Sequence, residues 1–527
     1  MKWFREIFIV VLVFFHVDHV ASAQQIERYA ETISAEELRE HLEILASDEY
    51  EGRETGQPGQ KKAAQYLADY YSGLGLKPSN NQSWFQQYPL KKESYSKSYA
   101  TSGNDKYAFI KDYYFFGSEQ SELVADEVVF AGYGIETKKY NDYKKIDVKD
   151  KVVICLLGEP LNKRGNKILS GDTESSEWGD NWELKAEAAS KRGAKGILFV
   201  NMQYEAYMKR VSYWLEQAPM RLDRKEEPKS EYERIPMIFI SPVMANALLS
   251  SSGKTVEQMV ERIHKKGKTQ STTCSAKLVF HMEPEIERLT AENVLCYIEG
   301  TDPDLKNEVV VISAHYDHIG IVNGQINNGA DDDGSGTVTT LELAEAFFMA
   351  KRDGYGTKRS ILILNVSGEE KGLLGSEWYS DNPVYPLEQT VCNLNVDMIG
   401  RKDDAHEDEN YVYLIGSDKL STDLHKISES VNAKHTKLKL DYTYNDPNDP
   451  NRFYYRSDHY NFAKHGIPVI FYFSGVHADY HKPGDDTEKI MFEKMSVIAK
   501  LIFHTACEVA NRDERLRVDV KNAFDGR

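Results

Sequence analysis

The C-terminal half of the chain carries histidines and carboxylates that each follow an apolar stretch. Imidazole and carboxylate groups are the side chains that hold pairs of zinc-like divalent ions, and such a pair activates water for hydrolysis. Five positions combine the right residue type with this placement: His315, Asp332, Glu370, Asp397 and His481. The pattern predicts a hydrolase with a two-metal centre.

These five residues divide naturally between two ions. One ion would take His315 and Asp397 as ligands. The other would take Glu370 and His481, and Asp332 would bridge the pair at the roughly 3.5–4 Å separation usual for two-metal hydrolases. Water held between two cations loses a proton readily, which supplies the nucleophile.

Two further carboxylates are predicted to act beside the ions. Glu369 adjoins Glu370, so its side chain can face the water and serve as general base. Asp317 lies on the same side of an extended strand as His315, where its carboxylate could hold the second imidazole nitrogen. A lone histidine or an acidic run is more often an ordinary polar feature. The coincidence of five segments outweighs that simpler interpretation.

Strands and helices alternate from about residue 275, and these elements must position the ligands. Residues 309–314 are almost continuously apolar, which is typical of a strand covered on both faces. A helical pattern at 337–350, a second strand at 361–366 and a final helix at 488–510 follow. This alternation predicts an α/β fold, a three-layer αβα sandwich with a mixed, largely parallel sheet. Ligands gather at the carboxyl ends of strands in such sheets.

The N-terminal and middle parts differ from this pattern. Ser34 and Glu37 form a capping box that predicts a helix. Short β-type runs and one helix make the middle a small α+β unit without a cluster of metal ligands. The expected domains are a signal peptide (1–23), the N-terminal part of a catalytic domain (24–118), an inserted domain (119–275) and the C-terminal part of the catalytic domain (276–527).

The N-terminus and the charge predict where the protein acts. Lys2 and Arg5 precede the apolar run 7–15, and small residues at 21–23 fit a cleavage site. The run is too short to span a bilayer. We therefore expect a secreted or periplasmic, cell-envelope protein without stable membrane insertion. The net charge of −18 argues against nucleic acid as a partner.

The cysteines do not suggest a disulfide framework. They are odd in number and widely spaced, and no CxxC pair is present. Cys155, Cys296 and Cys392 lie in apolar strand-like runs, where buried free thiols are expected. One disulfide bond, involving Cys274, stays open as an alternative in an oxidising compartment.

Together these motifs resemble the M28 family of zinc peptidases. The family pattern comprises HxD, GADDxxSG, an EE pair before GLLGS, an aspartate after a strand and a late histidine. The matching positions are 315–317, 329–336, 369–376, Asp397 and His481. The resemblance implies an aminopeptidase with two Zn²⁺ per chain, acting on peptides or proteins with a free N-terminus. It also implies that Asp332 bridges the ions and that the peptide bond after it is cis.

The resemblance extends beyond the metal ligands. The segment containing Ser457 and Asp458 is similar to one that lines the substrate pocket in related proteins, and Tyr472 and Phe473 are expected to shape the pocket for the first side chain of the substrate. The block 119–275 resembles a protease-associated (PA) domain. Other chemistry known for the fold, carboxypeptidase or glutaminyl cyclase activity, stays an alternative, and so does a non-catalytic peptide-binding protein.

Overall fold

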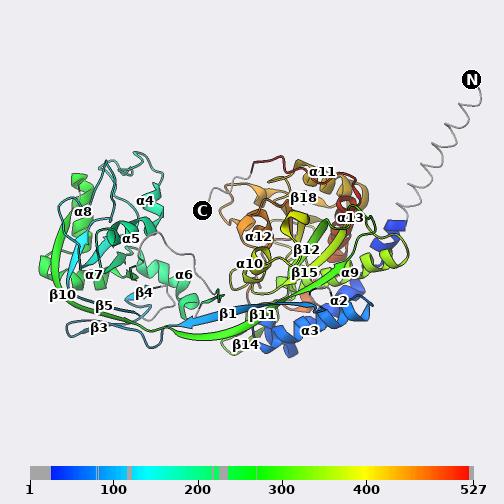
Figure 1. Ribbon diagram of the computed structural model, residues 1–527, viewed down its shortest axis with the longest axis horizontal. Coiled ribbons are helices and arrows are strands. Elements are labelled where there is room, and N and C mark those ends of the chain that lie inside the picture. The colour runs from blue at the N-terminus through cyan, green and yellow to red at the C-terminus, as the bar shows by residue number, and fades with distance from the viewer. Residues whose placement is uncertain are drawn as a thin grey trace, which may run out of the picture. The chain divides into compact units, whose positions relative to one another are not determined.

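The computed structural model describes residues 25–78, 80, 82–115, 121–216, 219–224, 235–268 and 270–521. The predicted signal peptide, residues 1–23, lies outside the described residues. The chain divides into two compact units, one made of Met1–Leu90 with Leu289–Arg527 and the other of Lys91–Arg288. Each unit has its own sheet and its own hydrophobic clusters (Figure 1).

Within the described residues, the strands that organise the first unit follow one another in the sheet in the order β18–β17–β19–β16–β12–β15–β11–β1. They are β1 (Phe85–Ser94), β11 (Glu285–Ile298), β12 (Val309–His315), β15 (Ser360–Val366), β16 (Thr390–Val396), β17 (Tyr411–Ile415), β18 (Lys439–Asp441) and β19 (Val469–Phe473). The central strands β19, β16, β12 and β15 run parallel, whereas β11 pairs antiparallel with β15 and β17 pairs antiparallel with β19. The sheet is therefore mixed and largely parallel at its centre.

Helices cover both faces of this sheet. They are α2 (Ala35–Leu45), α3 (Pro58–Gly73), α9 (Gly336–Arg352), α10 (Leu374–Asp381), α11 (Thr422–Val431), α12 (His459–Ala463) and α13 (Phe492–Asn511). Shorter turns used below are η1 (Asp48–Arg53), η3 (Ala330–Ser335), η5 (Asn432–Thr436) and the hairpin β13 (Gly320–Val322) with β14 (Gln325–Asn327). Ser34 caps α2 by accepting a hydrogen bond from the backbone of Glu37, as the capping box predicts.

The central strand β12 shows why the fold has three layers. Successive strand residues point to opposite faces. Val310 and Ile312 join the hydrophobic cluster that contains α2, α9 and α13, whereas Val309 and Val311 join the cluster that contains α10 and α12. Burial on both faces explains the nearly continuous apolar sequence of this strand. The predicted three-layer αβα sandwich is confirmed.

The second unit has a sheet in the order β3–β2–β10–β5–β6–β7–β9–β4. Its elements are β2 (Tyr99–Ser102), β3 (Asp105–Tyr107), β4 (Tyr113–Phe115), β5 (Ser121–Ala131), β6 (Val152–Leu156), β7 (Gly196–Val200), β9 (Met237–Ile240), β10 (Ser271–Met282), α4 (Glu177–Asp180), α5 (Trp182–Ser190), α6 (Tyr204–Glu216), α7 (Pro242–Leu248) and α8 (Val256–Lys266). Strands β5, β6, β7 and β9 are parallel. The unit contains more residues than the predicted block 119–275. Strands β2 and β4 lie before residue 119, yet β2 pairs with β10 and β4 pairs with β9.

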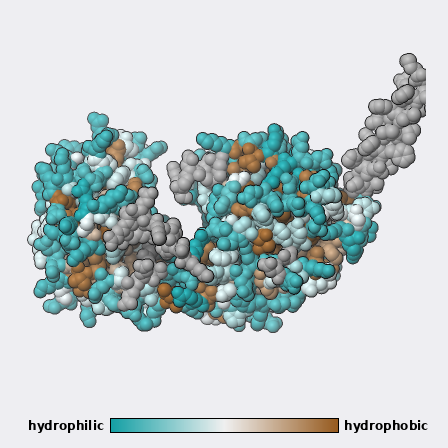
Figure 2. All heavy atoms as spheres, viewed as in Figure 1, coloured by the Kyte–Doolittle hydropathy of each residue, from teal (hydrophilic) through white to brown (hydrophobic). Residues whose placement is uncertain are grey.

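All five cysteines are buried and unpaired, so no disulfide bond involves Cys274. Within the described residues, no helix combines the length and apolar character needed to cross a membrane. Hydrophilic residues dominate the face shown in Figure 2, and hydrophobic residues on it are scattered.

Candidate metal centre

The central parallel strands bring the predicted ligands to one edge of the sheet. His315 is the last residue of β12, and Asp397 directly follows β16. Glu370 follows β15, and His481 lies in the loop after β19. Because these four strands are parallel neighbours, their carboxyl ends share an edge. Asp332 reaches the same edge from η3, between β12 and α9.

Distances show that Asp332 stands between two groups of ligands. Its Oδ1 atom lies 3.3 Å from Nε2 of His315, and that nitrogen lies 3.6 Å from Oδ1 of Asp397. Its Oδ2 atom lies 3.0 Å from Nε2 of His481, which is 3.1 Å from Oε2 of Glu370. The structure thus brings together all five residues that the sequence singles out, with Asp332 central.

The peptide bond between Asp332 and Asp333 is cis, as the resemblance implies. The flanking carboxylates hold the backbone of this segment in place. Asp333 accepts hydrogen bonds from the backbone N–H groups of His315, Gly336 and Met398. The acidic run is therefore not a solvated loop, since each of its carboxylates has a separate structural position.

Asp485 is a buried carboxylate that the sequence analysis did not select. It accepts hydrogen bonds from the backbone N–H groups of Asp331 and Asp332. Asp331 in turn accepts from the backbone N–H of Gly400 at 2.6 Å, and its other oxygen lies 3.3 Å from Nε2 of His477. Asp331 thus faces away from Asp332, which supports the choice of Asp332 as the central ligand.

His318 is a second residue that the sequence analysis missed, although it stands in the same HYDH motif as His315. It is fully buried, and its Nδ1 lies 2.8 Å from Oε1 of Glu370 without the alignment of a hydrogen bond. Its distance from Oδ2 of Asp332 is 3.8 Å. Gly329 permits this packing because a Cβ atom there would lie 2.4 Å from the His318 ring.

The position of Asp317 differs from the prediction. Nδ1 of His315 lies 3.0 Å from the backbone oxygen of Asp317 but 3.8 Å from its carboxylate. The imidazole therefore donates to the carbonyl, which leaves Nε2 free to act as a ligand. The Asp317 carboxylate instead accepts from the Thr55 hydroxyl at 2.6 Å and from the backbone N–H of Glu369 at 3.3 Å. It thereby positions the segment that carries Glu369.

Burial and neighbouring charged groups shift the pKa values of the residues in this cluster. Burial opposes protonation of His315, but the carboxylates of Glu369 and Asp397 raise its pKa well above the ordinary value. Burial also opposes protonation of His481, yet Asp332 and Glu370 raise its pKa to about 10. Burial raises the pKa of Glu369 well above its usual range.

The donor set fits divalent metal ions. Two groups of three side chains each offer ligand atoms within 4.8 Å of one another: His315 with Glu369 and Asp397, and His318 with Asp332 and Glu370. Oδ2 of Asp332, Oε1 of Glu370 and both nitrogens of His318 are buried without a hydrogen-bond partner among the described residues. Buried polar atoms without a hydrogen-bond partner are rare in proteins unless a water molecule or an ion contacts them. Imidazole and carboxylate ligands favour a zinc-type ion.

A small cavity of about 30 Å³ opens beside the cluster. It is lined by His315, Asp332, Glu369, Asp397, Met398, Phe453, Arg456, Phe471, Phe473, Val476 and Tyr480. Reactive groups therefore line one part of the cavity, and the rest is lined by aromatic and aliphatic side chains together with Arg456. This arrangement suits a ligand with a polar end at the cluster and an apolar side chain beside it.

The three residues suggested as substrate contacts do not line this cavity, because each is completely buried. The Ser457 hydroxyl donates to Oδ2 of Asp397 at 2.6 Å and so orients that ligand. Asp458 accepts from the hydroxyl of Ser376 at 2.5 Å. Tyr472 points into the hydrophobic cluster on the other side of the sheet from Phe471 and Phe473.

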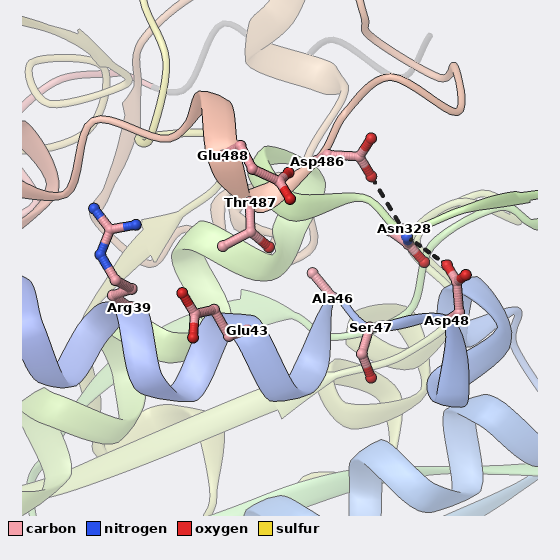
Figure 3. A pocket seen from close by; sticks show the side chains of 9 residues that line it. All are labelled: Arg39, Glu43, Ala46, Ser47, Asp48, Asn328, Asp486, Thr487 and Glu488. Atoms are coloured by element: carbon pink, nitrogen blue, oxygen red, sulfur yellow. Dashed lines mark hydrogen bonds between the residues drawn. The ribbon is translucent and has the colours of Figure 1, made fainter.

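A larger cavity of about 380 Å³ lies near the loop that follows β14. Figure 3 shows Arg39 and Glu43 on α2 at one side, and Asn328 linking Asp48 and Asp486 at the other. Its lining is polar and includes none of the clustered ligands. The reacting groups therefore lie in the smaller cavity.

Comparison with known proteins agrees with this geometry. Residues 293–506 match the model of Peptidase family M28. A probable leucine aminopeptidase of Trichophyton verrucosum is 32% identical over 220 residues, which cover 40% of this chain and 57% of that protein. Aminopeptidase YwaD of Bacillus subtilis is 26% identical over 215 residues, covering 40% and 42%. The chain thus spans about half the length of the curated relatives it matches.

Among solved structures, an aminopeptidase from Aneurinibacillus sp. strain AM-1 aligns with a TM-score of 0.54. The alignment covers 94% of this chain and 98% of that one, at 19% sequence identity. At this identity the likeness concerns the fold. It agrees with the mixed α/β architecture described above.

Metal binding should release protons and weaken as the pH falls. A metal ion needs neutral imidazoles, whereas the pKa of His481 is raised to about 10 and that of His315 is raised well above its ordinary value. Protons must therefore leave the cluster when an ion binds. Calorimetric titration of metal-free protein with Zn²⁺, repeated in buffers of different ionisation enthalpy, counts the protons. An affinity that does not change between pH 6 and pH 8 would contradict this account.

Replacing Asp485 should weaken metal binding although Asp485 is not one of the ligands. Asp485→Ala removes the acceptor for two backbone N–H groups at Asp332, so we expect a roughly 10–100-fold loss of affinity. Competition with a chromophoric chelator measures the change. The adjacent Asp486→Ala serves as the matched control, since that carboxylate contacts Asn328 and none of the cluster. Equal affinities in the two variants would refute the role of Asp485.

Proposed function

Because residues 293–506 of the chain form a domain of peptidase family M28, we propose that the protein is a zinc-dependent aminopeptidase. The observation that carries the proposal is the position of Asp332 between two imidazoles and two further carboxylates at the edge of the sheet. Relatives named as aminopeptidases support the same activity.

We propose that two ions bind, with His315 and Asp397 at one, Glu370 and His481 at the other, and Asp332 between them. When bound, such ions polarise the peptide carbonyl and lower the pKa of water, which makes attack possible near neutral pH. His318 lies close enough to Asp332 and Glu370 to hold their second oxygens or to join the ligands of the second ion.

Glu369 is the proposed general base. Its carboxylate lines the small cavity and lies 4.0 Å from Nε2 of His315. It would take a proton from the attacking water and return it to the leaving amine. Burial raises the pKa of Glu369, and a more basic carboxylate holds the proton more firmly between these two transfers. Asp317 orients this residue through the backbone N–H of Glu369.

The cavity indicates the substrate. Phe453, Phe471 and Phe473 would contact the first side chain of the peptide, which favours an apolar residue there. The free amino group would lie among the carboxylates of the cluster, whose negative charge attracts an ammonium group. An N-blocked peptide would lose this interaction and bring a carbonyl group into the same space.

Two further assignments belong with this function. We propose that the second unit is a PA-like domain that recruits or selects peptides, supported by its separate sheet and by the FAGYGI and DVKDKVVIC segments. We also propose export through the signal-like sequence of residues 1–23, which would place the enzyme outside the cytoplasm or in the cell envelope.

The proposed activity is tested with fluorogenic aminoacyl substrates, each with a free or an acetylated amino group, before and after removal of metal. We expect cleavage of free leucyl and phenylalanyl substrates, almost none of acetylated ones, and recovery of activity when Zn²⁺ is restored. Release of C-terminal residues would indicate a carboxypeptidase. Cyclisation of N-terminal glutamine would indicate a cyclase, and full activity without metal would overturn the proposal.

Glu369→Gln should keep the metal and lose the reaction. The amide fills nearly the same space but cannot accept the proton, so kcat should fall by at least ~10² while KM changes little. Steady-state kinetics together with metal analysis of the same sample provide the measurement. Turnover close to that of the wild type would remove Glu369 from the mechanism.

A further inference from the structure

Residues 53–55 lie against the catalytic edge of the first unit, although they are far from it in the sequence. Their backbone runs beside the residues that follow β12. Glu54 and His318 form a parallel bridge, and the backbone N–H of His318 donates to the backbone oxygen of Arg53 at 3.2 Å. None of residues 53–55 lines the cavity beside Asp332. Any effect of this segment on the reaction must therefore pass through another residue.

Thr55 is the residue of this segment that reaches the reactive groups. It is completely buried, and its hydroxyl donates to Oδ2 of Asp317 at 2.6 Å. Oδ1 of the same carboxylate accepts from the backbone N–H of Glu369 at 3.3 Å. One carboxylate thus links the N-terminal segment to the proposed general base, and Thr55 fixes the direction in which that carboxylate points.

The two hydrogen bonds of the Asp317 carboxylate differ in length. The bond from Thr55 is short, whereas the bond from the backbone of Glu369 is longer than usual, and Nδ1 of His315 lies 3.8 Å away. Without the Thr55 hydroxyl, one oxygen of a completely buried carboxylate would lose its partner, which is costly. We expect the Asp317 side chain then to turn toward another donor and to release the backbone of Glu369.

A second contact of the same segment lies at the rim of the site. Glu54 accepts from the ammonium group of Lys371 at 2.9 Å, just after Glu369 and Glu370 in the chain. The side chains of Glu54 and Lys371 are 26% and 17% exposed, so water reaches both. Ion pairs that water reaches are screened and contribute little. The buried hydrogen bond of Thr55 is therefore the stronger restraint.

The segment is itself held in place, which a positioning role requires. The buried guanidinium of Arg53 donates to the backbone oxygens of Tyr316 and Gly329. Gly52 packs closely against the β13–β14 hairpin, since a Cβ atom there would lie 2.3 Å from the backbone oxygen of Asn327. The Thr55 hydroxyl therefore starts from a fixed backbone, and a group on a fixed support can orient its partner accurately.

We propose that Thr55 is a positioning residue for the reaction, which acts through Asp317 on the backbone of Glu369. The inference rests on the proposed function, because it takes Glu369 as the group that transfers the proton. Loss of the Thr55 hydroxyl misplaces the Glu369 carboxylate and leaves the apolar wall of the cavity as it is. Removing the hydroxyl therefore lowers turnover more than substrate binding.

The test compares Thr55→Val, which removes the hydroxyl and keeps the shape of the side chain, with Thr55→Ser, which keeps the hydroxyl. Steady-state kinetics with a free leucyl fluorogenic substrate are measured on zinc-loaded protein, and zinc is counted by mass spectrometry in the same samples. In Thr55→Val, kcat should fall by roughly 10–100-fold while KM stays within about twofold and the zinc count is unchanged. Thr55→Ser should recover most of this loss.

Thr357→Val is the matched control. Thr357 is also buried, and its hydroxyl donates to the backbone oxygen of Arg359 at 2.7 Å, at the start of β15 and not at its catalytic end. This variant should show a lower thermal midpoint but the kcat of the wild type. An unchanged kcat in Thr55→Val, an equal fall of kcat in Thr357→Val, or a loss of zinc from Thr55→Val would overturn the inference.

A second measurement does not need activity. Hydrogen exchange followed by mass spectrometry reports on the peptide that contains Glu369, whose backbone N–H is bonded to Asp317. Exchange should be faster in Thr55→Val than in the wild type, Thr55→Ser and Thr357→Val. Equal exchange in all four proteins would overturn this inference alone, whereas a wild type that cleaves no aminoacyl substrate would overturn the proposed function.

Discussion

Repulsion among buried carboxylates is the constraint on which the catalytic edge of the first unit depends. Asp332, Glu369, Glu370 and Asp397 lie close together, and their common partners among the described residues are imidazoles. Buried charges of one sign are costly unless opposite charge lies between them. The carboxylates around this group, those of Asp333 and Asp485, are stabilised differently, because they accept hydrogen bonds from backbone N–H groups. The fold thus satisfies the outer acids with its own backbone and leaves the inner ones for cations.

The parallel centre of the sheet makes this arrangement rigid. Strands β19, β16, β12 and β15 are buried on both faces, so neither the ligands nor the residues that support them can shift without disturbing two hydrophobic clusters. Arg53 adds a second restraint. Its buried guanidinium donates to the backbone oxygens of Leu45, Tyr316, Asn328 and Gly329, which ties η1 to both sides of the loop that leads to Asp332.

The sequence predicts the strands, the layers and the ligands because each carries a local signal. Apolar runs such as 309–314 end at chemically distinctive residues, and one rule of sheet geometry places those ends together. The supporting contacts have no such signal. Asp485 and Ser457 act through hydrogen bonds to residues that are distant in the sequence, and their types are common in loops.

Other features could not be inferred for a similar reason. The backbone oxygen of Asp317, and not its carboxylate, accepts from His315, and the sequence does not encode that choice locally. The aromatic wall formed by Phe453, Phe471 and Phe473 combines two separate segments. Tyr472 does not belong to this wall because neighbouring strand residues point to opposite faces, and the sequence alone does not say which face is which.

The topology of β1 and β11 bears on how such a chain could have arisen. These strands are neighbours in the sheet, and the boundaries of the second unit fall within them. The intervening polypeptide therefore leaves and re-enters the sheet at adjacent positions. An ancestor with a shorter connection there would keep strands β12, β15, β16 and β19 in register, so this site tolerates the gain or exchange of an entire module without rebuilding the layer that holds the reactive groups.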